Sequence, residues 1–194
     1  MTDARTRPLF EEPSSASERT DPWSGPKGFM FGGMFLPAGT NGEMAQQYFD
    51  AANLLVADIE HDRLEDYKLA SPILYLYRHW LELMIKSIIG GCREHNLGKL
   101  AKRLNSYLWK RGVEVPDWIM TRLKEMNAID PDSTAFRYAE DRIAGEIYVS
   151  LSHLKRAMAT LNLALSSVAS KGVFPPEGLF ILSSDEGDDS FFRV

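Results

Sequence analysis

Hydrophobic positions between residues 41 and 170 recur every three or four residues, which is the spacing of one face of an α-helix. The clearest pattern lies in residues 140–170, where the apolar steps alternate between four and three: Ile147, Leu151, Leu154, Met158, Leu161, Leu165 and Val168. This spacing is that of an a/d seam, which favours packing at about 20° against neighbouring helices. The only extended piece we expect is a short one at residues 178–182. The pattern therefore predicts an all-α protein, an up-and-down bundle of four to five helices.

The first helix is predicted at residues 40–59. Thr40 stands three residues before Glu43, which is the spacing of a capping box. The apolar stripe that follows is expected to face the core: Met44, Tyr48, Ala51 and Leu55.

A second helix is predicted at residues 71–89 and is apolar on almost every side, so we expect it to be the most buried helix. Pro72 lies near its start, where a missing N–H costs nothing. Gly90 and Gly91 end it.

Two shorter helices are predicted between this helix and the last one. Residues 95–109 carry four leucines at helical spacing: Leu97, Leu100, Leu104 and Leu108. Pro116 begins the next helix, which Asp130-Pro131 ends, and its apolar stripe is Trp118, Ile119, Leu123 and Met126.

The two ends of the chain differ from this helical domain of residues 41–170. Residues 1–40 predict a flexible arm, with an apolar Gly/Phe/Met stretch at 27–36 that packs on its own subunit or is exchanged with a partner copy. Residues 171–194 predict an acidic tail.

Composition narrows the function classes. The net charge of −5 over 194 residues argues against a general nucleic-acid coat, although it allows a local basic patch. The single Cys92 excludes a disulfide framework within the chain and a multi-cysteine zinc site. No signal peptide or membrane span is visible, so a cytoplasmic protein without a metal or a cofactor is predicted.

Charged side chains within the apolar second helix are the first candidates for function. Arg78, Glu82 and Lys86 follow one another at i,i+4 spacing, so the acid can pair with both bases. They form either an internal salt-bridge network or the lining of an anionic ligand site. His79 and His95 are either ordinary helix-capping and core-edge residues or an acid–base pair for a phosphodiester.

Positive charge gathers at the third predicted helix. Lys99, Lys102 and Arg103 share a face opposite the leucine stripe. A solvated helix face is one reading, and contact with phosphate is the other.

The segment after Asp130-Pro131 places Phe136, Arg137 and Tyr138 in succession. If it is extended, Phe136 plugs the end of the bundle while Arg137 projects to its mouth and binds phosphate, with Tyr138 as a stacking face or hydroxyl donor. Alternatively, Arg137 caps a helix end or pairs with Glu82 or Asp141.

These segments, in this order, resemble the HEPN superfamily, the nucleotide-binding domains of higher eukaryotes and prokaryotes. The resemblance covers about residues 44–170 and depends on "YLYRHWLELMIKSII", "REHNLGKLAKRL" and "DSTAFRY". It implies a compact helical bundle, usually a homodimer, and either a metal-independent ribonuclease of a toxin or defence system or an inactive RNA- or nucleotide-binding module. The nuclease members carry a His four to six residues after an Arg, whereas here no His follows Arg137 before His153.

The resulting expectation is a non-catalytic, regulatory HEPN-like module that binds RNA or a nucleotide in a defence, stress or toxin–antitoxin context. A homodimer and a cognate antitoxin or other partner protein go with it. Two alternatives stay open. One is an endoribonuclease that uses Arg78, His79 or Arg137 in place of the usual pair. The other is a helical scaffold that interacts through the apolar arm.

Overall fold

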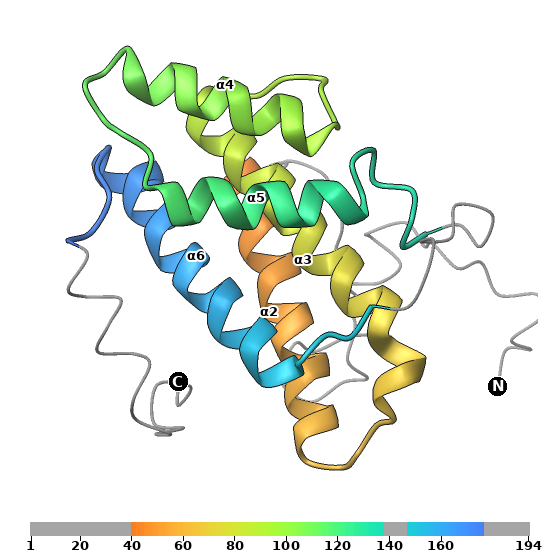
Figure 1. Ribbon diagram of the computed structural model, residues 1–194. Helices are drawn as coiled ribbons and strands as arrows, with labels where there is room; N and C mark the ends of the chain where they lie inside the picture. Colours follow the sequence, from red (N-terminus) through yellow and green to blue (C-terminus); the bar gives the residue numbers. More distant parts are fainter. Residues whose placement is uncertain (1–39, 138–146, 177–194) are drawn as a thin grey trace, which may run out of the picture. The chain divides into compact units, whose positions relative to one another are not determined.

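The computed structural model describes residues 40–137 and 147–176, apart from the side chain of Tyr67. Within these ranges the chain forms α-helices and no strand, which confirms the all-α prediction (Figure 1). The helices are α2 (Asn41–Glu60), α3 (Asp66–Ile89), α4 (Leu97–Trp109), α5 (Asp117–Ile129) and α6 (Leu151–Lys171). The apolar arm and the extended piece predicted at residues 178–182 lie outside the described residues. So does most of the acidic tail.

Helix α3 is the centre of the bundle, because it packs against α2, α4 and α6. Figure 1 shows α2, α3 and α6 lying lengthwise, with α4 and α5 across them. The central position of α3 confirms the prediction that this apolar helix is the most buried. None of the described helices is long and apolar enough to cross a membrane.

The capping box of α2 is present as predicted. Thr40 Oγ1 accepts from the backbone N–H of Glu43, and the Glu43 carboxylate accepts from the backbone N–H of Thr40 at 2.7 Å. The centre of the buried face of this helix is one position from the predicted stripe, of which Tyr48 and Leu55 pack against the core while only partly buried. Met44 is 38% exposed, whereas the buried residues are Ala45, Phe49, Ala52 and Val56. The two stripes have equivalent helical spacing, so packing against α3 decides between them.

Helix α3 begins at Asp66, five residues earlier than predicted, and Pro72 lies inside it. Proline has the backbone φ of a helix and removes one N–H. Because Leu69, within the added turn, packs against the core, that turn remains helical despite Pro72. At the other end, Gly90 adopts a left-handed conformation with φ of 92° and stops the helix, as predicted.

Helix α6 begins at Leu151 rather than near residue 140. The Ser150 hydroxyl caps it by accepting from the backbone N–H of His153. Ile147 is therefore outside the helix and 50% exposed, so the first position of the predicted seam was wrong. The rest of the seam is confirmed, because five of its residues are buried: Leu154, Met158, Leu161, Leu165 and Val168.

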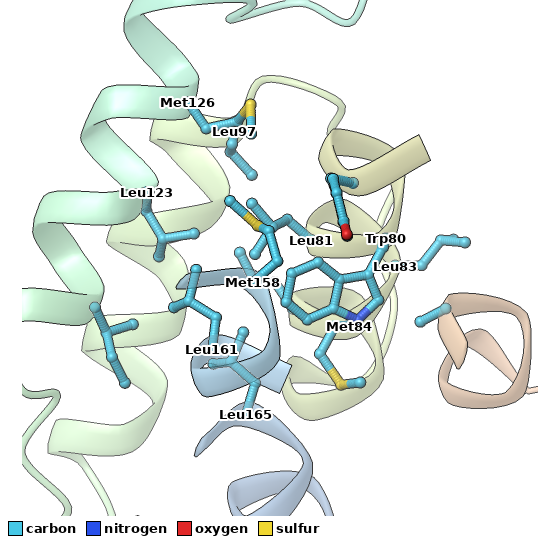
Figure 2. Packing of buried hydrophobic residues seen from close by; sticks show 14 of the residues in the cluster. Trp80, Leu81, Leu83, Met84, Leu97, Leu123, Met126, Met158, Leu161 and Leu165 are labelled. Carbon is cyan, nitrogen blue, oxygen red and sulfur yellow. The ribbon is translucent and has the colours of Figure 1, made fainter. Parts of the chain in front are cut away.

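The core joins apolar side chains of α3, α4, α5 and α6, as Figure 2 shows for ten labelled residues. The leucine stripe predicted for α4 is buried, and so are Ile119, Leu123 and Met126 of α5. Trp118 of α5 is only partly buried. This shared core positions α3, α4 and α5 relative to one another. The candidate site lies where the middle of α3 meets the start of α4 and the segment that follows α5.

Candidate functional site

Buried charges in α3 form one connected network. Glu82, which is 1% exposed, accepts from Arg78 Nη1 at 2.7 Å and from Lys86 Nζ at 2.8 Å. The predicted pairing of this acid with both bases is confirmed. Burial raises the pKa of the Glu82 carboxyl, but the hydrogen bonds and charges of Lys86 and Arg78 outweigh this effect and leave the pKa below its usual value. Glu82 is therefore ionised at neutral pH.

Arg78 connects α3 to two distant segments. Its Nη2 donates to the carbonyls of His95, at 2.6 Å, and Pro131, at 3.2 Å, and its Nε donates to the carbonyl of Asp130 at 3.2 Å. His95 lies just before α4, and Asp130 and Pro131 lie just after α5. A fully buried guanidinium requires such acceptors. One side chain thus positions the start of α4 and the segment that follows α5.

The Asp130 carboxylate organises the turn after α5. Its Oδ1 accepts from the backbone N–H groups of Thr134, at 2.7 Å, and Ala135, at 3.1 Å. Its Oδ2 lies 3.6 Å from Arg78 Nε. Phe136, which is 9% exposed, enters the core at the end of this turn. Its burial agrees with the prediction, but the segment is a turn and not the extended piece on which that prediction depended. The turn is therefore held by the polar contacts of Asp130 and by the burial of Phe136 in the core.

Arg137 follows directly and is exposed. Its Nε donates to the carbonyl of Ser133, and its guanidinium carbon lies 5.8 Å from the centroid of the Tyr75 ring. Tyr75 is stacked on His79, with 5.6 Å between centroids and 9° between planes. Tyr48 of α2 meets His79 edge-on at 4.5 Å. The arginine thus lies beside a row of three rings. The face of an aromatic ring attracts a cation, so Tyr75 favours this position of the Arg137 guanidinium.

His79 is held as a neutral imidazole at pH 7. Burial lowers the pKa of this imidazole below its usual 6.5, and the negative charge of Glu82 opposes the shift only in part. Three cations lower the pKa further: Arg78, Lys86 and Arg137. A neutral His79 can donate or accept a hydrogen bond but contributes no charge to the site.

Replacing His79 with Phe should make stability less dependent on pH between about 7.5 and 5.5. Because the folded-state pKa is lowered, the unfolded chain binds more protons in this window, so the wild type loses stability as the pH falls below 6.5. The phenyl ring keeps the packing against both tyrosines but cannot titrate. The slopes should differ by at most about 1.4 kcal/mol per pH unit, measured by urea unfolding. Parallel slopes would mean that His79 does not titrate differently in the two states.

His95 extends from the network to the surface. Its Nδ1 lies 2.8 Å from Glu82 Oε1, although 67% of its side chain is exposed. The predicted helix-capping role of a histidine was wrong for α4, because Asn96 caps this helix by accepting from the backbone N–H of Lys99 at 3.0 Å. The histidine therefore presents an exposed ring that is oriented by a buried carboxylate.

The predicted candidates fall into two groups. The contacts above bring together four of them: Arg78, His79, His95 and Arg137. Three others lie on the exposed face of α4, as predicted for a basic face: Lys99, Lys102 and Arg103. Tyr138 lies outside the described residues.

Three residues of the site were not predicted as site residues from the sequence: Tyr48, Tyr75 and Asp130. Tyr75 had a usable signal, because it precedes His79 by four residues and so shares its helix face. Asp130 was interpreted only as a helix terminator. Nothing local indicated that Tyr48 would reach His79, because α2 and α3 meet only in the folded chain.

This arrangement is suited to binding an anion. Arg137 offers a charged fork, and the rings beside it offer apolar faces and hydroxyl groups. Among the described residues, no group of three or more His, Cys, Asp and Glu side chains could hold a metal ion.

Comparison of the chain with protein-family models, with curated proteins and with solved structures finds no match. Function is therefore inferred from the side chains themselves.

Proposed function

We propose that this protein is a HEPN-like module that binds the phosphate of RNA or a nucleotide at a surface formed by Tyr75, His79, His95 and Arg137. The observation that carries the proposal is the placement of Arg137. It is exposed, lies over the Tyr75 ring, and follows a turn that Asp130 and Arg78 fix. Such a guanidinium is oriented before a ligand arrives, which lowers the entropy lost on binding.

The exposed position of Arg137 favours an anion at this surface. The buried network beneath it is balanced, with two basic and two acidic residues: Arg78 and Lys86 against Glu82 and Asp130. Arg137 instead lies at the surface, where its guanidinium is beside the Tyr75 ring. A phosphate group accepts bidentate hydrogen bonds from arginine, and a base can stack on a tyrosine ring.

A regulatory binding role is favoured over catalysis. Arg78, one of the residues that an unusual ribonuclease would need, is 0% exposed, and its donors contact Glu82 and backbone carbonyls. It can support the site but cannot reach a substrate. The alternative with a specific observation in its favour is a metal-independent ribonuclease that uses the imidazoles of His79 and His95. The observation is that His95 presents an exposed ring whose Nδ1 lies 2.8 Å from Glu82 Oε1.

Replacing Arg137 with Ala should weaken binding of a fluorescein-labelled twelve-residue oligouridylate about ten- to a hundred-fold. A charge-assisted contact of this kind contributes about 1.5–3 kcal/mol. The slope of the logarithm of the binding constant against the logarithm of the salt concentration should become shallower by about 0.7 for one lost phosphate contact. Replacing Arg137 with Lys keeps the charge but loses the fork, so it should recover only part of the affinity. Fluorescence anisotropy of the labelled strand in EDTA measures the affinity of the wild type, Arg137→Ala and Arg137→Lys.

The matched control is Arg156→Ala, which removes the same charge from an exposed position of α6. It should leave affinity within about two-fold, since an isolated surface charge acts weakly over a distance. If folded Arg137→Ala binds as the wild type does, the phosphate site is elsewhere. Cleavage of the oligouridylate in EDTA would favour the ribonuclease instead.

A homodimer, a cytoplasmic location and a partner such as a cognate antitoxin remain predictions that go with this function. The scaffold alternative, which uses the apolar arm at residues 27–36, falls outside the described residues.

A further inference from the structure

The exposed face of α4 is basic in a chain that is acidic overall. Residues 97–111 contain five lysines and arginines and no carboxylate, whereas the whole chain has a net charge of −5. Within the described part of the chain, Lys102, Arg103 and Lys110 have no carboxylate within ion-pair distance. Lys99 differs, since it lies 3.6 Å from Glu94. The face therefore presents positive charge that no carboxylate of the described residues neutralises at Lys102, Arg103 and Lys110.

This face is also hollowed. A shallow depression of about 310 Å³ is lined by three basic residues and two hydroxyl-bearing ones: Lys102, Arg103, Lys110, Ser106 and Tyr107. The lining combines ammonium, guanidinium and hydroxyl donors with one aromatic ring. Donors of these kinds bind phosphate oxygens.

Aromatic side chains accompany the cations. The Arg111 guanidinium lies 3.5 Å from the centroid of the Tyr107 ring. Trp109, two residues before Arg111 in the sequence, is 71% exposed. A tryptophan is usually well buried, so this exposure leaves a large flat surface available for stacking. Cations beside an exposed aromatic ring are characteristic of surfaces that bind single-stranded nucleic acids.

The length of the face favours an oligonucleotide over a mononucleotide. Lys102 and Lys110 are eight residues apart on one helix, which places them about 12 Å apart along its axis. One phosphate cannot contact both ends of such a row, whereas the backbone of a short strand can follow it.

We infer that the exposed face of α4 binds single-stranded RNA several nucleotides long, with Lys102, Arg103 and Lys110 contacting phosphates and Trp109 stacking on a base. This inference rests on the proposed function and narrows its ligand from RNA or a nucleotide to a single strand. An acidic peptide matches the charge, but it does not use the exposed indole for stacking.

The first test reverses two charges. The double variant Lys102→Glu/Lys110→Glu should weaken binding of the labelled twelve-residue oligouridylate at least about thirty-fold and make the salt dependence shallower by about 1.4 for two lost contacts. The control Lys124→Glu/Arg156→Glu changes the net charge equally at exposed positions of α5 and α6. It should change the affinity less than about three-fold. Equal losses in the two variants would overturn the inference, since only net charge would then matter.

The second test concerns stacking. Trp109→Ala should weaken oligouridylate binding about five- to a hundred-fold, as expected for one base stacked on an aromatic side chain. Tyr148→Ala is the control, because Tyr148 is a 91% exposed aromatic outside α4, and it should bind as the wild type does. Addition of RNA should also quench tryptophan emission in the wild type more than in Trp109→Phe. Unchanged affinity and quenching in the Trp109 variants would refute a stacking role.

Competition by other anions tests whether the α4 face prefers a single strand, and comparison of the variants separates the α4 surface from the Arg137 site. ATP and a decaglutamate peptide should compete for the labelled strand at least about a hundred-fold more weakly than unlabelled oligouridylate, and equal competition by either would overturn the inference. Loss of binding in Arg137→Ala but not in the α4 variants would refute the α4 surface and keep the proposed function. The reverse pattern would support the α4 surface and refute the Arg137 site.

Discussion

Replacing Arg78 with Ala should lower the free energy of unfolding by about 3–5 kcal/mol, which is the usual cost of removing one partner from a buried ion pair. The substitution leaves Glu82 buried with a single fixed cation, Lys86. It also removes the donors to three carbonyl groups of two segments distant in sequence. Chemical denaturation at neutral pH, monitored by circular dichroism, measures the loss.

The control is an ion pair of similar distance at the surface. Arg122 Nη1 lies 2.5 Å from Glu125 Oε2 on α5, and the two side chains are 35% and 54% exposed. Arg122→Ala should cost less than about 1 kcal/mol, because solvent screens such pairs. A cost of that size for Arg78→Ala would show that the network does not hold the two segments.

The Arg78 variant should also affect the candidate site. Arg78 fixes the turn that carries Arg137, so the folded fraction of Arg78→Ala should bind RNA more weakly although Arg78 itself is buried. The position of Arg78 in the network thus links stability to binding.

Replacing Leu161 with Asp should prevent folding or leave the chain insoluble. Leu161 is 0% exposed, and Figure 2 shows it among the core side chains between Met158 and Leu165 of α6. A carboxylate there has no partner and costs several kcal/mol, a large part of the 5–15 kcal/mol by which a domain of this kind is usually stable. The helical circular dichroism signal and the soluble yield report the outcome.

The same helix provides a matched control. Leu163, two residues further along α6, is 46% exposed. Leu163→Asp introduces the same charge on the outer face and should change stability by less than about 1 kcal/mol. If Leu161→Asp were as stable as Leu163→Asp, the packing of α6 against α3 and α2 would be wrong.

Local sequence determined which segments are helical and how several of them end. The capping box at Thr40, the left-handed Gly90 and the leucine stripe of α4 involve residues within a few positions of one another. Their effects need no tertiary contact, so the sequence alone predicts them. The i,i+4 pairing of Glu82 with its two bases belongs to the same class.

Tertiary structure alone decided which face of α2 is buried, where α3 and α6 begin, and which residues complete the candidate site. Two adjacent stripes of α2 have equivalent spacing, and only contact with α3 selects the one that contains Phe49. Asp130 reaches Arg78 across 52 residues of sequence. A periodicity of three to four residues contains no information on contacts between residues so far apart in sequence. The partners of a buried charge are set by how the helices pack.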